Sequence, residues 1–308
     1  MMNSLKIIFM GTPEFAVPSL EVLVKNKFSV VAVVTAPDKP QGRGQKLTAS
    51  PVKECAVKHG IPVLQPTNLK SPEFINQLKS YQANLQIVVA FRMLPQVVWT
   101  MPALGTFNLH ASLLPQYRGA APINWAIING EKETGITTFF LKHEIDTGSI
   151  LFQEKETILR DDDAGSLYHR LMNKGAWLVL KTVKAIEAGT IQPQPQDESH
   201  VLTHAPKIFK ETCEINWNQP AEAIHNFVRG LSPYPAAWAK LNEKNFKLYK
   251  VEPAVGNRQS SVDHGQIETD NKTFLKIKVQ DGWVSILEFQ PEGKKRMTIE
   301  EFFRGNKI

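Results

Sequence analysis

Three polar side chains occur in a pattern that is suited to acyl transfer. Asn108 and His110 are two residues apart in a strand predicted over 106–110, so strand alternation places both side chains on one face. Asp146 follows a second apolar strand, predicted over 135–140, and can reach the same end of a sheet. An amide N–H stabilises a developing oxyanion, an imidazole moves a proton, and a carboxylate orients the imidazole. Such a site needs neither a covalent intermediate nor a metal.

Each of the two segments also fits a purely structural role. A single histidine at the end of a strand is more often hydrogen-bonded into the fold than catalytic, and Asp146-Thr147-Gly148 alone is a favourable turn sequence. The chemistry therefore depends on the elements that would bring the two segments together.

The first half of the chain alternates strands and helices. Its strands are continuous apolar runs, which is typical of strands covered by helices on both faces. We therefore expect a doubly wound, mostly parallel, Rossmann-like α/β sheet, in which ligands bind beyond the carboxyl ends of the strands. The predicted strands are 6–10, 29–35, 85–90, 106–110 and 135–140, with a further segment at 150–157, and the predicted helices are 18–26, 52–59, 72–81 and 164–188.

A change of composition divides the chain. From Gly189 to Gln196, proline and glutamine replace the apolar periodicity. The sequence predicts an α/β domain over 1–189, a linker over 190–208 and a smaller C-terminal OB-like β-barrel domain over 209–308. In the last of these we expect one helix at 220–231 and five short strands at 236–241, 246–251, 265–268, 275–278 and 283–289.

Several common cofactor motifs are missing from the sequence. The turn after the first strand, Gly11-Thr12-Pro13-Glu14-Phe15-Ala16, lacks the second and third glycines of the dinucleotide fingerprint, and no P-loop motif occurs. The acidic run 161–163 precedes a helix and is expected to cap it rather than to bind a metal. The two cysteines, Cys55 and Cys213, cannot build a disulfide framework or a four-thiolate zinc site.

The overall composition is that of an ordinary soluble protein. Of 308 residues, 42% are hydrophobic and 21% charged, which excludes disordered and collagen-like chains. The apolar run at the N-terminus is too short for a secretion signal, and no later run is long enough to cross a membrane. We therefore expect a cytoplasmic protein without membrane contact. The net charge of +6 is in the direction expected for a polyanionic partner.

A longer motif contains the three polar residues. The run Asn108-x-His110-x-Ser112-Leu113-Leu114-Pro115-x-x-Arg118-Gly119, followed by Asp146-x-Gly148, resembles the signature of the folate-dependent formyltransferases. The opening 9–16, the segment 37–47 and the C-terminal β domain are similar to the members of that family that act on methionyl-tRNA. The resemblance covers essentially the whole chain.

The resemblance implies an activity and a set of residues. The reaction would transfer the formyl group of 10-formyltetrahydrofolate to the α-amino group of methionyl-initiator tRNA, for translation initiation. Asn108, His110 and Asp146 would be the catalytic trio, and residues 112–115 would line the folate site. No metal is implied, and the expected state is a monomer. The four predicted folate-site residues are Ser112, Leu113, Leu114 and Pro115.

Basic residues supply the predicted tRNA contacts. The loop 36–50 carries Lys39, Arg43 and Lys46, and Arg43 matches the arginine with which the family contacts the acceptor end of the tRNA. Lys207 lies near the end of the linker and is predicted to contact the tRNA backbone. Without the resemblance, a solvated loop is the favoured interpretation of 36–50, and strand faces solvated by lysine would give the same pattern as the later basic residues. Further lysines that could follow the phosphate backbone are Lys210, Lys240, Lys244, Lys247 and Lys250.

Three points stay open at the level of the sequence. Arg92 stands where many family members have glycine after an aromatic residue; it could meet an anionic part of the folate or form a surface salt bridge. A small amine, such as a nucleotide-linked amino sugar, is an alternative acceptor. A further alternative function is that of a non-catalytic RNA-binding protein. In that case Trp217, Trp238 and Trp283 could stack on bases, or they could be core residues.

Overall fold

The chain is described by a computed structural model that covers residues 4–41, 46–199, 202–241, 244–254 and 264–308. It contains two compact units, and each is assembled from segments that are separated in the sequence. The first unit comprises residues up to 118, 135–156 and 169–203, and the second comprises 119–134, 157–168 and 204–308. Two internal segments, 119–134 and 157–168, thus pack with the C-terminal residues, and the predicted domain boundaries at 189 and 209 stay a prediction.

The first unit is built on one seven-stranded sheet with the order β10-β9-β7-β6-β1-β2-β5. Four neighbouring pairs are parallel, whereas β9 runs antiparallel to β7. The predicted mostly parallel α/β sheet is confirmed. The strands are β1 (Lys6–Gly11), β2 (Ser29–Val34), β5 (Val63–Leu64), β6 (Leu85–Val89), β7 (Thr106–His110), β9 (Glu133–Phe140) and β10 (Ile150–Thr157).

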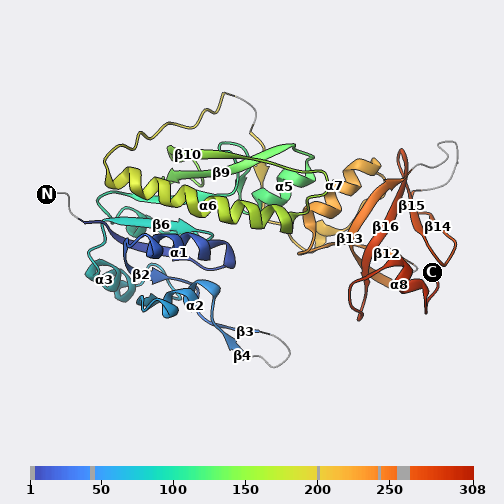
Figure 1. The fold of residues 1–308 in the computed structure, drawn as a ribbon, viewed down its shortest axis with the longest axis horizontal. Coiled ribbons are helices and arrows are strands. Elements are labelled where there is room, and N and C mark those ends of the chain that lie inside the picture. Colours follow the sequence, from blue (N-terminus) through green and yellow to red (C-terminus); the bar gives the residue numbers. More distant parts are fainter. Residues whose placement is uncertain (1–3, 42–45, 200–201, 242–243, 255–263) are drawn as a thin grey trace. The chain divides into compact units, whose positions relative to one another are not determined.

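Helices cover both faces of this sheet. All five residues of β6 are buried, and alternate strand residues point to opposite faces, so neither face of that strand is open to solvent. Figure 1 shows helices α1, α3 and α6 running along the strands. The helical elements are η1 (Glu14–Ala16), α1 (Val17–Lys25), α2 (Pro51–Lys58), α3 (Pro72–Ser80), α4 (Gln96–Trp99) and α6 (Ala164–Glu187).

The helix starts follow from their capping residues. Ser50 accepts a hydrogen bond from the Lys53 backbone N–H at the start of α2, and Pro51 occupies the first turn, where its missing N–H does not matter. At the start of α6, the carboxylate of Asp163 accepts from the Ser166 N–H at 2.8 Å. This bond confirms the predicted capping role of the acidic run.

Elements that the periodicity did not predict are short. β5 has two residues and α4 has four, which is too few for a helix or strand period to register. The loop 36–50, predicted as irregular, contains the antiparallel strands β3 (Lys39–Gln41) and β4 (Lys46–Thr48).

The second unit contains an antiparallel β domain with the strand order β12-β13-β16-β15-β14, and β17 also pairs with β16. The described pairings establish the antiparallel domain, and its closure into an OB-like barrel stays a prediction. Its strands are β12 (Ala237–Leu241), β13 (Lys244–Ala254), β14 (Ile267–Thr269), β15 (Leu275–Val279), β16 (Gly282–Pro291) and β17 (Met297–Thr298). The unit's other elements are α5 (Pro122–Ile128), η2 (Glu211–Cys213), α7 (Ala221–Leu231) and α8 (Ile299–Phe303), with the two-residue strands β8 (Arg118–Gly119) and β11 (His204–Ala205) at its border.

Close packing of two helices explains why α5 belongs to this unit. A Cβ atom at Gly230 of α7 would lie 2.6 Å from Ile128 Cγ1, so only glycine allows this approach. The Asn124 side chain of α5 donates to the Gly230 carbonyl at 2.8 Å. A contact across more than a hundred residues therefore assigns 119–134 to the C-terminal unit.

The structure also bears on the cysteines and on membrane-spanning helices. Cys55 and Cys213 are both free and buried. Within the described residues, none of the helices combines the length and the apolar character that crossing a bilayer requires.

The capping box of α8 gives a prediction about stability. Thr298 Oγ1 accepts from the Glu301 N–H at 3.2 Å, and the Glu301 carboxylate accepts from the Thr298 N–H at 3.0 Å. We expect Thr298→Ala to lower the free energy of unfolding by about 1 kcal/mol, because one helix N–H loses its partner. Urea unfolding measures this change. Thr298→Ser keeps the hydroxyl and should cost clearly less; equal losses for both variants would assign the effect to the threonine methyl group instead.

Candidate active site

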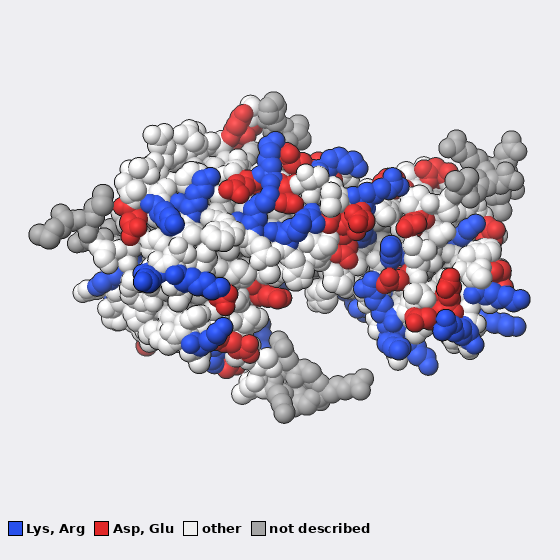
Figure 2. Space-filling view, viewed as in Figure 1, with Lys and Arg blue, Asp and Glu red and all other residues white. Residues whose placement is uncertain are grey.

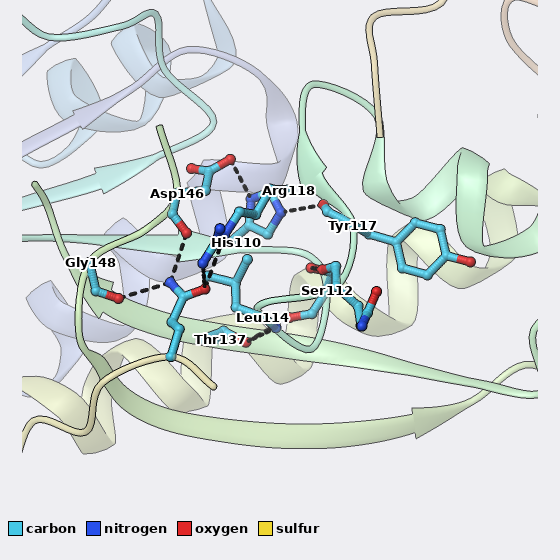
Figure 3. A network of polar contacts seen from close by, with 10 residues as sticks. His110, Ser112, Leu114, Tyr117, Arg118, Thr137, Asp146 and Gly148 are labelled. Carbon is cyan, nitrogen blue, oxygen red and sulfur yellow. Dashed lines mark hydrogen bonds and ion pairs between the residues drawn. The ribbon is translucent and has the colours of Figure 1, made fainter. Parts of the chain in front are cut away.

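His110 ends β7 and is buried. Its Nε2 atom lies 2.9 Å from the backbone carbonyl oxygen of Tyr117. Because a carbonyl can only accept, Nε2 must carry a proton and donate it to Tyr117. In the neutral ring the lone pair then resides on Nδ1, which faces the Asp146 carboxylate at 3.9 Å (Figure 3). The ring also meets Phe139 edge-on, with 6.5 Å between centroids.

Asp146 lies in the loop between β9 and β10. Its side chain is 13% exposed, and its backbone has φ of 56°, a left-handed conformation that a non-glycine residue adopts only when its surroundings hold it there. Gly148, two residues later, lies so close to β9 that an added Cβ would stand 1.5 Å from the Phe140 carbonyl oxygen. The loop conformation is therefore tightly determined.

Asn108 lies two residues before His110 on the same strand face. Its side chain is half-buried, and in the part of the chain that the structure describes its carboxamide forms no hydrogen bond. The structure thus brings His110 and Asp146 together and places Asn108 on the face of β7 that carries His110.

Thr137 of β9 fixes the loop that follows His110. Its hydroxyl donates to the Ser112 carbonyl at 2.6 Å and accepts from the Leu114 N–H at 3.2 Å. Gln153 of β10 donates to the Leu114 carbonyl at 2.8 Å and to Thr137 Oγ1 at 3.0 Å. The loop is therefore held before any ligand binds.

The predicted folate residues differ in their exposure. Ser112 and Leu114 are buried, and the Ser112 hydroxyl already donates to the Gln116 carbonyl at 2.6 Å. Leu113 and Pro115 are half-buried. Leu113 and Pro115 can therefore present side chains to a ligand, whereas Ser112 and Leu114 hold the loop from within.

The predicted tRNA loop has a well-fixed base. Asp38 pairs with Lys53 at 2.6 Å and accepts from Gln65 at 2.8 Å, and these bonds hold the pKa of the Asp38 carboxyl below its usual value. Lys39 is exposed at the start of β3. Arg43 and the side chain of Lys46 lie outside the described residues, so their predicted roles stay predictions.

Arg92 forms no surface salt bridge among the described residues, and its contact with an anionic part of the folate stays a prediction. Its guanidinium donates to the carbonyl oxygens of Thr67, at 2.9 Å, and Pro66, and it lies 5.7 Å from the centroid of the Phe91 ring. The side chain remains exposed. Arg92 therefore pins one exposed loop to another through backbone carbonyls, with no carboxylate partner among the described residues.

A basic groove of about 990 Å³ lies within the second unit. Four lysines line it, Lys207, Lys210, Lys240 and Lys247, against two glutamates. Phe209 and Tyr234 also line the groove and are largely exposed. Figure 2 shows lysine and arginine side chains on the visible face of this unit, with aspartate and glutamate side chains among them. The predicted tRNA residue Lys207 thus belongs to a concave, positively charged surface.

The three tryptophans considered as stacking residues are buried, hydrogen-bonded or packed against the core. Trp283 is 8% exposed, and Trp238 donates its indole N–H to the Lys210 carbonyl at 2.8 Å. Trp217 packs partly buried against the core of the β domain. The exposed aromatic surface of the groove comes instead from Phe209 and Tyr234.

One group of three potential metal ligands occurs among the described residues. Ligand atoms of Glu21, Cys55 and His59 lie within 4.8 Å of one another. Burial, and next the charge of Glu21, raise the pKa of the Cys55 thiol, which opposes formation of the thiolate that a metal binds. Glu21 also lies near Lys25 and Lys58. We assign no catalytic step to this group.

Sequence reasoning missed Gln196. It was predicted to lie in a linker, yet its carboxamide contacts Arg118 and the backbone of the Asp146 loop. Only a long-range pairing distinguishes it from its neighbours, so the composition of the segment gave no signal.

The fold and the site define a class of protein. The family model described as "Formyl transferase" matches residues 5–183, and "Formyl transferase, C-terminal domain" matches residues 207–307. The chain belongs to the formyl transferase family, and the resemblance inferred from the motif is confirmed.

Individual proteins with similar sequences or structures give a more specific comparison than the family models. A methionyl-tRNA formyltransferase of Bacteroides fragilis is 54% identical over 98% of this chain and 95% of its own length. The protein of the same description from Flavobacterium johnsoniae is 50% identical over 99% and 97%. The crystal structure of the N-formyltransferase from Helicobacter canadensis, in complex with folinic acid and dTDP-3-aminofucose, matches 92% of this chain and 98% of that chain with a TM-score of 0.65 and 22% identity. That last likeness shows a shared fold.

The fit of Gly148 against β9 yields a prediction about the site. We expect Gly148→Ala to lower kcat about 10²-fold, because the added Cβ must displace the Asp146 loop from His110 and displacement of about 1 Å is enough for such a loss. Steady-state formyl transfer by the purified variant measures it. Gly305→Ala, where no atom lies within 4 Å of the added Cβ, is the matched control and should keep wild-type kcat. Wild-type kcat in Gly148→Ala would contradict the placement of Asp146.

Proposed function

We propose that this chain transfers the formyl group of 10-formyltetrahydrofolate to the α-amino group of methionyl-initiator tRNA, with Asn108, His110 and Asp146 as its catalytic residues. The observation that carries the proposal is the pairing of the His110 Nδ1 atom with the Asp146 carboxylate at the end of β7, in a chain of the formyl transferase family. Relatives with 50% and 54% identity over nearly the whole chain are methionyl-tRNA formyltransferases, which supports this acceptor.

The chemistry begins with attack of the neutral methionine amine on the formyl carbon. A C–N bond forms, the carbonyl electrons move to oxygen, and the attacking nitrogen becomes positively charged. Asn108 is half-buried on the His110 face of the strand, and its N–H groups stabilise the oxyanion. The tetrahedral intermediate then collapses as the bond from carbon to the folate nitrogen breaks.

His110 carries the proton between the two nitrogens. Its Nε2–H is held by the Tyr117 carbonyl, so Nδ1 is the atom that accepts a proton from the attacking amine and returns it to the departing folate nitrogen. During that interval the ring is an imidazolium, and the Asp146 carboxylate at 3.9 Å stabilises its charge. The products are formyl-methionyl-tRNA and tetrahydrofolate, and no proton is gained or lost by the enzyme.

The loop 112–115 is our proposed folate contact. Its backbone is fixed by Thr137 and Gln153, so a rigid surface meets the cofactor, with Leu113 and Pro115 offering apolar side chains. A preorganised contact of this kind lowers the entropy cost of binding. We propose no resident metal.

The tRNA contacts in this proposal come from both units. Lys39, Arg43 and Lys46 belong to the segment 36–50 of the first unit, and Lys207 lines the basic groove of the second. Lysine ammonium groups bind phosphates without reading sequence, which suits the backbone of a folded RNA.

The activity is tested with purified protein, 10-formyltetrahydrofolate and three acceptors: methionyl-initiator tRNA, methionyl-elongator tRNA and a nucleotide-linked amino sugar. Release of formyl-methionine after base hydrolysis of the ester measures tRNA formylation. We expect formylation of the initiator tRNA alone. Formylation of the amino sugar alone would contradict the proposed acceptor while leaving the chemistry intact.

Asn108 gives a prediction about catalysis. Asn108→Ala removes an oxyanion donor, which typically lowers kcat by about 10²–10³, or about 3 kcal/mol of transition-state stabilisation. Single-turnover formylation at saturating tRNA measures the chemical step directly. Folate affinity, followed by tryptophan fluorescence, should stay near the wild-type value. A variant with wild-type turnover would remove Asn108 from the mechanism.

The lysines of the groove give a prediction about tRNA affinity. We expect Lys207→Ala combined with Lys247→Ala to weaken tRNA binding and to reduce the dependence of affinity on salt, because fewer counterions are released. Binding isotherms between about 50 and 200 mM salt measure both quantities. Lys272→Ala, an exposed lysine outside the groove, is the control. An unchanged salt slope in the double variant would exclude the groove as a phosphate contact.

A further inference from the structure

Gln196 stands apart from the segment that contains it. Residues 192–195 and 197–199 are exposed, whereas Gln196 is half-buried. Close to it, Ile150 and Gln194 exchange two backbone hydrogen bonds of 2.7 and 2.8 Å, which tie the segment to the start of β10. The backbone of this segment is therefore hydrogen-bonded to the strand that follows the Asp146 loop.

The carboxamide of Gln196 uses its full hydrogen-bonding capacity. Its Oε1 atom accepts from Arg118 Nε at 3.1 Å and from a terminal nitrogen of Arg118 at 2.6 Å. Its Nε2 group donates to the carbonyl oxygens of Asp146, at 2.7 Å, and Gly148, at 2.8 Å. Rotating the amide by half a turn would place donors against donors and acceptors against acceptors, so this orientation is unique.

The two bonds that Gln196 Nε2 donates reach Asp146 and Gly148, the two residues with the most restricted conformations in the Asp146 loop. Asp146 holds a left-handed backbone with φ of 56°, and Gly148 lies directly against the Phe140 carbonyl. Two donors from one rigid amide stabilise this turn without contacting the Asp146 carboxylate, which leaves the carboxylate directed toward His110.

Arg118 links the same carboxamide to the other partner of His110. The Arg118 side chain is 9% exposed and also pairs with Glu198 at 2.6 Å. It directly follows Tyr117, whose carbonyl receives the His110 Nε2–H. One guanidinium–carboxamide pair therefore adjoins both groups that face the ring nitrogens: the Tyr117 carbonyl on one side and the Asp146 loop on the other (Figure 3).

We propose that Gln196 is a positioning residue for catalysis, which holds the Asp146 carboxylate at its working distance from His110 while Arg118 fixes the orientation of the Gln196 amide. This inference rests on the proposed roles of His110 and Asp146. The Gln196 side chain is then part of the active site's support.

The variants separate positioning from simple stabilisation. Gln196→Met keeps the length of the side chain and removes all four bonds. Gln196→Glu keeps the acceptor for Arg118 but replaces the donors with an oxygen that faces two carbonyls. Gln194→Met is the matched control, because Gln194 lies in the same segment and its side chain makes one marginal bond of 3.5 Å.

We expect both Gln196 variants to lower kcat about 10- to 100-fold, since small displacements of a catalytic group have effects of that size. KM for folate and for tRNA should stay within about twofold of wild type, because binding energy common to ground and transition states is retained. Gln194→Met should match wild type in all three constants. A general loss of folding would instead lower the yield of active protein and leave kcat per active site unchanged. That result, or wild-type kcat in Gln196→Glu, would overturn the proposal.

A second measurement does not depend on turnover. Nitrogen-15 NMR compares the chemical shift of the His110 Nδ1 atom in wild type, Asp146→Asn, Gln196→Met and Gln194→Met. Because the Asp146 carboxylate lies 3.9 Å from Nδ1, we expect Asp146→Asn to move this signal and Gln196→Met to move it as well, with Gln194→Met unchanged. If wild type fails to formylate tRNA but the chemical shifts follow this order, the proposed function fails and the positioning role stands. An Nδ1 signal unchanged in Gln196→Met while Asp146→Asn moves it would refute the positioning role.

Discussion

The bond between His110 and the Tyr117 carbonyl decides which ring nitrogen can do chemistry. A carbonyl oxygen cannot donate, so Nε2 is committed as a donor and Nδ1 is the only nitrogen of the ring available for proton exchange. The other groups around the ring are consistent with this assignment of the two nitrogens. Asp146 approaches Nδ1, Phe139 packs against the ring edge, and the buried position of the ring keeps competing water away.

The sheet explains how residues far apart in sequence meet at this ring. β7 delivers Asn108 and His110 on one face, and the antiparallel neighbour β9 brings both the Thr137 hydroxyl and, through its following loop, Asp146. The register pairs His110 with Thr137, so the residue that anchors the loop 112–115 sits opposite His110. Because β9 runs antiparallel to β7, the loop after β9 begins beside Thr106, at the opposite end of β7 from His110, and it folds back so that Asp146 reaches the His110 ring.

The local sequence pattern predicted the strands and the side chains that share a strand face. Period-two alternation placed Asn108 and His110 together, and continuous apolar runs located the strands within one or two residues. Gln196 could not be predicted in this way, because its hydrogen bonds are to residues 50 and 78 positions away and its neighbours in the sequence are solvent-exposed. The same limit applies to the segments 119–134 and 157–168, whose membership of the second unit is decided by long-range packing such as Gly230 against Ile128.

The tautomer of His110 is the most direct test of this account. Nitrogen-15 NMR of the ring, in protein at a pH where His110 is neutral, distinguishes a protonated from an unprotonated nitrogen at each position. The account predicts a protonated Nε2 and an unprotonated Nδ1, with Tyr117 as the acceptor. A protonated Nδ1 with a free Nε2 would contradict it, because the lone pair would then point away from Asp146 and toward a carbonyl oxygen.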